Sequence, residues 1–305
     1  DTVSGQCVGD HGFGHAIVEE GVDGNGERHA NEATAGRGKE RFGHRASVCG
    51  LSQCESRRGK MSARRRRPVR ERRPRVEVRK SGDGLALKVE GTFASWYRPG
   101  SVATGSVWDA IAAPVLALPA RRRREILILG VAGGSAARVV RAIAPAAHIV
   151  GVELFQDVID AAREHFDLDA LELDLVVADA LDYLREDGPR FDLILEDVFV
   201  GVGRSVHKPG WLPEPGHQLA VARLAPGGLL VSNTLDEAAE ITRSMRELFP
   251  GVLRIEVDDF ENVIVVGGPS GLSALDLRRA VAGDPVLKDS VSSLSFRTAG
   301  SRAPG

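Results

Sequence analysis

The chain has 305 residues, of which 43% are hydrophobic, and a formal net charge of −2. This length suits one α/β domain of about 200 residues with additions, or two small domains. It contains neither the run of about 20 apolar residues that a membrane-spanning helix needs nor an apolar core behind a basic start, as in a secretory signal. We therefore expect a cytoplasmic protein with no membrane partner.

Residues 1–74 are predicted to be a disordered arm that is basic towards its end. The first 60 residues show no apolar period and cannot bury enough apolar surface to offset the entropy of ordering. Met61 reads like a natural start, so we expect the preceding residues to take no part in the fold. Residues 57–80 hold about 13 Arg and Lys against two Glu. We expect a solvated arm and no nucleic-acid partner, because no aromatic residues interleave with these cations to stack on bases; a contact of the arginine run with nucleic acid or an anionic surface is the weaker alternative.

The three cysteines, Cys7, Cys49 and Cys54, all lie in this first segment. The expected folded region therefore has no disulfide framework. Cys49 and Cys54 with His44 have the wrong gap and one ligand too few for a zinc site, so we expect no metal.

Residues 75–120 are predicted to form a β-hairpin, a loop and a helix. Two alternating apolar runs flank Ser-Gly-Asp-Gly at residues 81–84, which is a hairpin signal. A loop carrying Trp96, Tyr97 and Pro99 follows, and then a helix from about residue 105 to 118.

Residues 121–270 alternate between apolar strands and amphipathic helices, and residues 271–305 are expected to be a helix and a flexible tail. The strands are expected at EILILG, HIVGVE, LDLVVAD, FDLILED, GLLVSNT, VLRIEV and NVIVVGG. This alternation predicts right-handed βαβ units in a parallel sheet covered on both faces. The last two strands are expected to form an antiparallel pair. The fold class is therefore α/β, a Rossmann-like sheet that is parallel with an antiparallel C-terminal strand.

Ligands bind such sheets beyond the carboxyl ends of the strands, where the strand order reverses. The first strand ends in a loop in which Gly130, Ala132 and Gly134 let a ligand approach the backbone at the start of a helix. Glu153 ends the second strand about 20 residues later, where a carboxylate can accept hydrogen bonds from a ribose diol. The alternatives are an ordinary glycine turn and a solvated strand-end Glu.

Two further acids end the next strands. Asp179, followed by the small Ala180, can accept a hydrogen bond from the amine of adenine, or can simply cap the following helix. Asp197 lies beside the glycine loop and can steer a cation or take a proton from an attacking amine. Glu196 precedes Asp197, and the alternation of a strand points the two side chains to opposite faces.

These segments in this order resemble the S-adenosylmethionine-dependent methyltransferase fold and, within it, the spermidine synthase family of polyamine aminopropyltransferases. The similarity spans about residues 85–268 and rests on ILILGVAGGSAARVV, GVELFQDVIDAAREHF, VVADALDYL, FDLILEDVF and TGSVWDAIAAP. It implies a transferase in polyamine biosynthesis that uses decarboxylated S-adenosylmethionine, or S-adenosylmethionine itself, and a small-molecule amine. A homodimer is compatible with this family.

The sequence departs from the family pattern on the acceptor side. The family has an acid in the glycine loop where this chain has Gly133, and a second acid after the fourth strand where it has Val200. The predicted site has the following members: for the cofactor, Gly130, Ala132, Gly133, Gly134, Glu153, Leu154, Asp179 and Ala180; for the substrate, Tyr97, Trp108 and Asp109; for catalysis, Asp197.

Three functions follow from this pattern. The leading one is aminopropyl transfer to an amine. Methyl transfer from S-adenosylmethionine is the alternative, because the loop lacks the acid that contacts the amino end of the aminopropyl group. A non-catalytic homologue that retains nucleoside binding is the third.

Overall fold

The computed structural model describes residues 73–299 of the chain. The expectations for the three cysteines, for Met61 and for the arm up to residue 72 lie outside the described residues.

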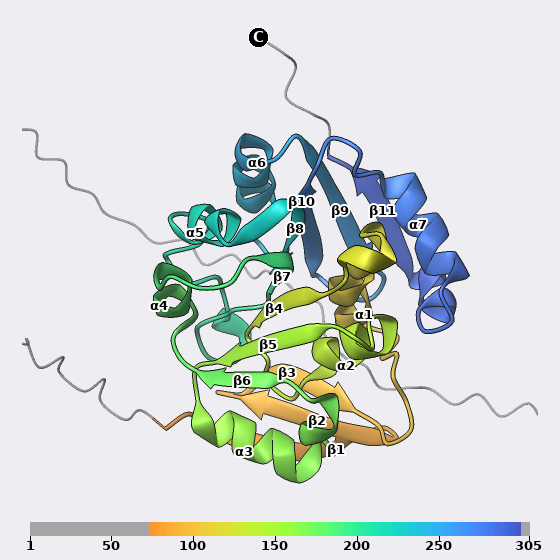
Figure 1. The fold of residues 1–305 in the computed structure, drawn as a ribbon. Helices are drawn as coiled ribbons and strands as arrows, with labels where there is room; N and C mark the ends of the chain where they lie inside the picture. Colours follow the sequence, from red (N-terminus) through yellow and green to blue (C-terminus); the bar gives the residue numbers. More distant parts are fainter. Residues whose placement is uncertain (1–72, 300–305) are drawn as a thin grey trace, which may run out of the picture. The chain divides into compact units, whose positions relative to one another are not determined.

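Eight strands form the central sheet, in the order β11-β9-β10-β8-β7-β4-β5-β6 (Figure 1). The strands are β4 (Glu125–Leu129), β5 (His148–Glu153), β6 (Asp174–Val177), β7 (Phe191–Glu196), β8 (Leu224–Thr234), β9 (Gly251–Val257), β10 (Val263–Gly268) and β11 (Leu294–Thr298). Strands β4 to β8 are mutually parallel, whereas β10 is antiparallel to β8 and β9. The chain runs outward from β4 through β5 to β6 and then returns to β7 on the other side of β4. The predicted sheet is confirmed, and its order reverses between β4 and β7.

Helices cover both faces of this sheet (Figure 1). One buried apolar cluster joins α1, α2 and α7 to one face, and a second joins α4, α5 and α6 to the opposite face. The helices are α1 (Val107–Ala112), α2 (Ser135–Ile143), α3 (Gln156–His165), α4 (Ala180–Arg185), α5 (Gly216–Ala222), α6 (Ala238–Leu248) and α7 (Ala274–Gly283). Because both faces are buried, the parallel strands are near-continuous apolar runs, as the sequence shows.

A separate antiparallel sheet, β1-β2-β3, precedes the central one. It consists of β1 (Val76–Ser81), β2 (Gly84–Val89) and β3 (Thr92–Tyr97), and the hairpin expected from the sequence is its first half. Strand β3 replaces the predicted loop and pairs with β2 through a register shift at Leu87 and Lys88. This irregularity breaks the alternation from which a strand is predicted. Val158 of helix α3, and Phe166 directly after that helix, pack against this sheet.

Two other elements differ from the sequence-based expectation. The helix expected up to residue 118 is α-helical only to Ala112 and continues as a 3₁₀ turn, Ala113–Ala117, because Pro114 has no N–H to donate. The C-terminal segment was expected to be a helix and a flexible tail. After α7 it instead forms a 3₁₀ turn, Lys288–Ser293, and then β11, which extends the central sheet beside β9. Strand β11 has only five residues, with two buried or half-buried apolar positions, so it is too short to show the alternation by which a strand is recognised in a sequence.

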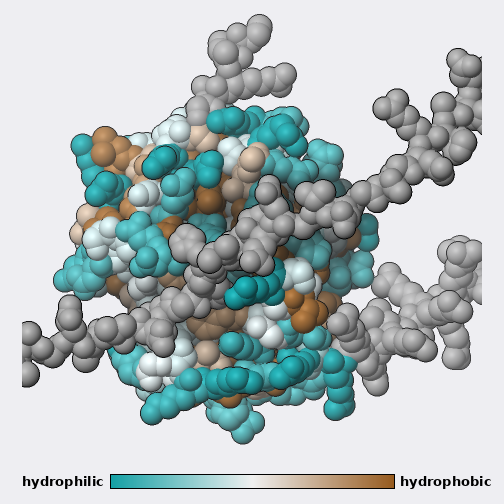
Figure 2. Space-filling view, turned by 180° about the vertical axis from the view of Figure 1, so that it is seen from behind, coloured by the Kyte–Doolittle hydropathy of each residue, from teal (hydrophilic) through white to brown (hydrophobic). Residues whose placement is uncertain are grey.

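On the face opposite to that of Figure 1, the coloured surface is mostly hydrophilic and its hydrophobic residues form small separate groups (Figure 2). Within residues 73–299, no helix has the length and apolar character needed to cross a membrane.

Candidate active site

The glycine loop, residues 130–134, lies between two strands that end in carboxylates. Strand β4, which leads into the loop, pairs with β5 on one side and with β7 on the other. Gly130 donates its N–H to Val152 O at 2.9 Å, and Asp197 donates its N–H to Leu129 O at 2.9 Å. Gly130 has φ +85°, and a Cβ there would come within 2.6 Å of Asp197 O. Only glycine fits this position, because the backbone after β7 passes directly beside it.

Glu153 turns back from the end of β5 to the glycine loop. Its Oε2 accepts the Ala132 N–H at 3.0 Å, and its Oε1 accepts the Phe155 N–H at 3.2 Å. Burial raises the pKa of Glu153, and these backbone hydrogen bonds oppose the rise. Ala132 has φ +46°, a conformation that is uncommon for a residue with a side chain. Glu153 therefore fixes the loop as well as presenting a carboxylate beside it.

The N-terminal sheet holds the loop from the other side. Gly133 donates its N–H to Ser95 Oγ at 2.8 Å, and Ser135 Oγ donates to Trp96 O at 2.7 Å. A Cβ on Gly133 would lie 2.7 Å from Ser95 Cβ and 3.1 Å from the Phe166 ring. The spermidine synthase family has an acid at the position of Gly133, whereas this chain has no space for a side chain there. The sequence gives no signal for Ser95, because 38 residues separate it from Gly133.

Asp179 caps helix α4, which is one of the two roles predicted for it; the other is a hydrogen bond to the amine of adenine. Its Oδ1 accepts the N–H groups of Leu181 at 2.8 Å and Asp182 at 3.3 Å. Its Oδ2 makes no hydrogen bond to the residues that the structure describes, so this oxygen can accept one from a ligand. Leu154, next to Glu153, is 47% exposed, and Ala180 is buried. The exposed Leu154 side chain, directly after β5, provides an apolar surface on which a flat ring can lie.

Asp197 is a half-buried carboxyl group at the end of β7. Desolvation raises its pKa to about 7, and the neighbouring Glu196 carboxylate acts in the same direction. The hydrogen bond from Asn233 and the charge of Lys208 oppose this rise. Asn233 Nδ2 donates to Asp197 Oδ1 at 2.7 Å. A carboxyl group whose pKa lies near neutrality can hold or release a proton under ordinary conditions.

A buried ion pair lies beside Asp197. Lys208 Nζ donates to Glu196 Oε1 at 2.6 Å, and Ser232 Oγ donates to Glu196 Oε2 at 2.5 Å. His217, in α5, is also buried, and neither of its ring nitrogens has a hydrogen-bond partner in the described part of the protein. Desolvation lowers the pKa of His217 to about 4, so its ring is neutral at pH 7. Lys208, Ser232 and His217 are not among the site residues predicted from the sequence.

The predicted substrate residues do not gather at this edge. Asp109 is completely buried, and its oxygens accept four hydrogen bonds, from Thr104 N, Thr104 Oγ1, Gly105 N and Ser290 Oγ. Trp108 is buried in the core, with its ring 5.2 Å from that of Phe93. Neither side chain offers a substrate any surface. Trp108 and Asp109 therefore have a structural role, because helix α1, which carries them, packs against one face of the central sheet.

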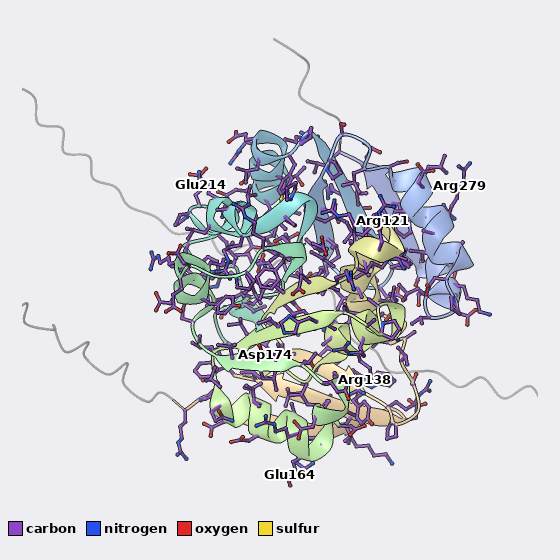
Figure 3. The ribbon with its side chains drawn as sticks, viewed as in Figure 1. Arg121, Arg138, Glu164, Asp174, Glu214 and Arg279 are labelled. Carbon is purple, nitrogen blue, oxygen red and sulfur yellow. The ribbon has the colours of Figure 1, made fainter. Side chains whose placement is uncertain are left out.

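Tyr97 is half-buried at the end of β3. The guanidinium of Arg138, a residue of α2 that Figure 3 labels, lies 4.4 Å from the centre of the Tyr97 ring, and the Phe166 ring lies 6.0 Å from the same ring. Tyr97 therefore joins the N-terminal sheet to α2 and α3. Among residues 73–299 no group of three or more His, Cys, Asp or Glu side chains is placed to hold a metal ion.

No known family model matches the chain. It is 36% identical over 81 residues to a polyamine aminopropyltransferase of Synechococcus sp. (strain JA-2-3B'a(2-13)), a match that covers 25% of this chain and 26% of the relative. It is 26% identical over 153 residues to a Drosophila melanogaster protein named eEF1A lysine and N-terminal methyltransferase homolog, covering 47% of this chain and 23% of that protein. The chain thus matches about a quarter of the length of these curated relatives.

The fold matches solved structures over most of their length. The crystal structure of a probable spermidine synthase from Corynebacterium glutamicum ATCC 13032 superimposes with a TM-score of 0.58 at 22% identity, covering 76% of this chain and 94% of that one. A spermidine synthase in complex with the transition-state analogue AdoDATO gives 0.57 at 17% identity, covering 73% and 82%. This chain has a spermidine synthase-like fold. The carboxyl ends of β4, β5 and β7 lie at one edge of this sheet, which is the edge where the sequence predicts a binding site.

Proposed function

We propose that the chain is a transferase that binds an adenosyl sulfonium compound at the carboxyl edge of β4 to β7 and transfers an aminopropyl group to a small-molecule amine. The observation that carries this proposal is the placement of Glu153, whose carboxylate contacts the glycine loop, and of Asp197, whose backbone passes beside Gly130 on the other side. One is suited to hold a nucleoside and the other to handle a proton.

The residues present fit the adenosyl part of such a compound. The oxygens of Glu153 accept backbone hydrogen bonds from Ala132 and Phe155, and because a carboxylate has about four acceptor sites they can also accept ribose hydroxyls. Its negative charge would repel a 2′-phosphate. The exposed face of Leu154 and the available Oδ2 of Asp179 suit the adenine ring and its amine.

Asp197 suits the acceptor side of the reaction. A bound sulfonium compound supplies an electrophilic carbon with a neutral thioether as its leaving group. The acceptor amine loses one proton when its nitrogen forms the new bond to carbon, and Asp197 can accept that proton because its pKa lies at about 7. Orientation of the amine by the same carboxylate would supply much of the rate, since the leaving group needs little activation.

The relatives support both halves of this proposal. A polyamine aminopropyltransferase has a local match in sequence, and a spermidine synthase that binds AdoDATO has a matching fold.

Methyl transfer is the second candidate, and the loop geometry favours it. Gly133 offers no acid to the amino end of an aminopropyl group, and Ser95 and Phe166 fill the space that such an acid would need. The similarity to a lysine and N-terminal methyltransferase homolog points the same way.

The proposal is tested by isothermal titration of the protein with S-adenosylmethionine, decarboxylated S-adenosylmethionine and methylthioadenosine. Binding of at least one is expected, and Glu153→Gln should weaken it at least tenfold, because the NH₂ end of the amide donates and cannot accept a ribose hydroxyl. Glu164→Gln, an exposed glutamate on α3, is the matched control and should leave affinity unchanged (Figure 3). If none of the three compounds binds, the proposed function is wrong.

The transferred group is identified by mass spectrometry after incubation with putrescine. With the decarboxylated compound, a gain of one aminopropyl unit supports the leading proposal. A gain of one methyl group with S-adenosylmethionine supports the second candidate. If the compounds bind and neither product forms, the chain is a nucleoside-binding homologue without these activities.

A further inference from the structure

Two asparagine side chains form a hydrogen-bonded chain that ends on Asp197. Asn233 lies near the end of β8, and its Nδ2 donates to Asp197 Oδ1 at 2.7 Å. Asn262 precedes β10, and its Nδ2 donates to Asn233 Oδ1 at 2.9 Å. Asn233 is buried, and its backbone lies opposite Ile264 in the ladder between β8 and β10. The chain of contacts thus crosses three neighbouring strands.

The second amide determines which way the first one faces. An asparagine side chain has a donating end and an accepting end, and the two can exchange by a rotation of the amide. Asn262 offers an N–H to Asn233, so Asn233 presents its oxygen to Asn262. Its donating end must then face Asp197. With the opposite orientation, an amide oxygen would face a carboxylate oxygen, and two acceptors would repel each other.

The first amide in turn orients the carboxyl group. Asp197 Oδ1 is engaged by Asn233, and Oδ2 makes no hydrogen bond to any residue between 73 and 299. Oδ2 is therefore the oxygen available to an acceptor amine. An oriented carboxylate requires no reorganisation when a substrate binds, which is how fixed polar groups contribute to catalysis.

We propose that Asn233 and Asn262 are positioning residues that hold Asp197 in the orientation and charge state needed to receive a proton from the acceptor amine. This inference rests on the proposed function only for the role of that proton. The hydrogen-bonded chain can be tested on the protein without any ligand.

Several charged groups lie near Asp197 or near the two asparagines. Glu196 and Lys208 act on Asp197 from β7 and from the following loop, and they pair with each other. His217, from α5, interacts with this same pair. The acids next to Asn262 in the turn between β9 and β10 are exposed; they are Asp258, Asp259 and Glu261. The two asparagines are uncharged, so their effect on the titration of Asp197 can be separated from the effect of the neighbouring charges.

The experiment is a carboxyl NMR titration of protein labelled with ¹³C at the Asp side-chain carboxyl carbon, with the Asp197 signal assigned from its loss in Asp197→Asn. In the unaltered protein the signal should titrate near pH 7. Asn233→Leu removes the donor and should raise the midpoint by about one pH unit or more, because a hydrogen bond to a charged group favours the charged form. Asn262→Leu frees the Asn233 amide to rotate and should raise the Asp197 midpoint by about half a pH unit.

Glu261→Gln is the matched control, since it alters the residue next to Asn262 and leaves both amides in place. Its midpoint should stay within about 0.2 pH units of the unaltered protein, as expected for an exposed charge. Thermal melting of each variant shows that it folds. Asn262 is only half-buried, so Asn262→Leu decides the question if Asn233→Leu fails to fold.

A merely structural role would lower the melting temperature and leave the titration unchanged. Unchanged midpoints in the folded variants would overturn the inference, even if the protein binds adenosyl compounds. Raised midpoints support it, even if no adenosyl compound binds, in which case the proposed function alone fails. Where turnover is measurable, the acid limb of its pH profile should move with the NMR midpoint.

Discussion

Replacing Asp197 by asparagine is expected to stabilise the fold at alkaline pH while removing the proposed proton acceptor. The pKa of Asp197 is about 7 in the fold, against 3.8 for an unperturbed aspartate. Between these values the folded state binds a proton that the unfolded state has released, so stability falls as the pH rises. A difference of about 3 pH units corresponds to about 4 kcal/mol lost by pH 8. Asparagine has no such charge, and its Oδ1 can still accept the Asn233 hydrogen bond.

His217 has the opposite effect in an overlapping pH range. Its pKa is lowered to about 4 from 6.5, so the unfolded state binds the extra proton and stability rises with pH between these values. The difference corresponds to about 3 kcal/mol. The contributions of Asp197 and His217 therefore nearly cancel between about pH 4 and 6.5. Each single substitution should expose the slope of the remaining group.

The assay is urea unfolding at pH 4, 5.5 and 8 for the unaltered protein, Asp197→Asn and His217→Leu. Relative to the unaltered protein, Asp197→Asn should gain little stability at pH 4 and about 2–4 kcal/mol at pH 8. His217→Leu should become less stable as the pH rises from 4 to 7. If the advantage of Asp197→Asn does not grow between pH 4 and 8, Asp197 is not the desolvated acid that its surroundings indicate.

Three further substitutions test the loop and the buried pair. Lys208→Met should destabilise the fold by about 3–5 kcal/mol in urea unfolding, because it leaves the buried Glu196 carboxylate without its partner. Ser95→Ala should cost about 1–2 kcal/mol and weaken adenosyl binding in calorimetry, because the Gly133 N–H loses its acceptor. Glu153→Gln should cost about 1–3 kcal/mol in stability in addition to its binding defect, because one of the two backbone donors then faces an amide NH₂ group.

The controls for these substitutions are exposed counterparts. Arg185→Met breaks an exposed i,i+3 pair with Asp182 and should change stability by less than about 0.5 kcal/mol. Ser205→Ala, at an exposed hydroxyl, should affect neither stability nor binding. A Lys208→Met variant as stable as Arg185→Met would show that the Glu196 pair contributes nothing, and normal adenosyl binding by Ser95→Ala would contradict the proposed loop support.

The sequence was sufficient to predict the central sheet and the residues at its carboxyl edge. Apolar runs that alternate with amphipathic helices permit few packings, and in a parallel sheet they bring the ends of β4, β5 and β7 to one edge. Gly130, Glu153 and Asp197 could therefore be placed together from their order alone. The third strand of the N-terminal sheet could not, because a register shift at Leu87 breaks its period.

The charge states of these groups and the contacts that hold them depend on residues that are far apart in the sequence. Ser95 lies 38 residues from Gly133, and Asn233 lies 36 residues from Asp197, so no local pattern reveals either contact. Asp109 looked like an available acid in the sequence, whereas burial and four hydrogen bonds give it a structural role. A pKa depends on desolvation and on neighbours brought together by folding. The order of strands and helices along the chain therefore brings these residues to one edge of the sheet, whereas burial and long-range side-chain contacts decide which of them can take a proton.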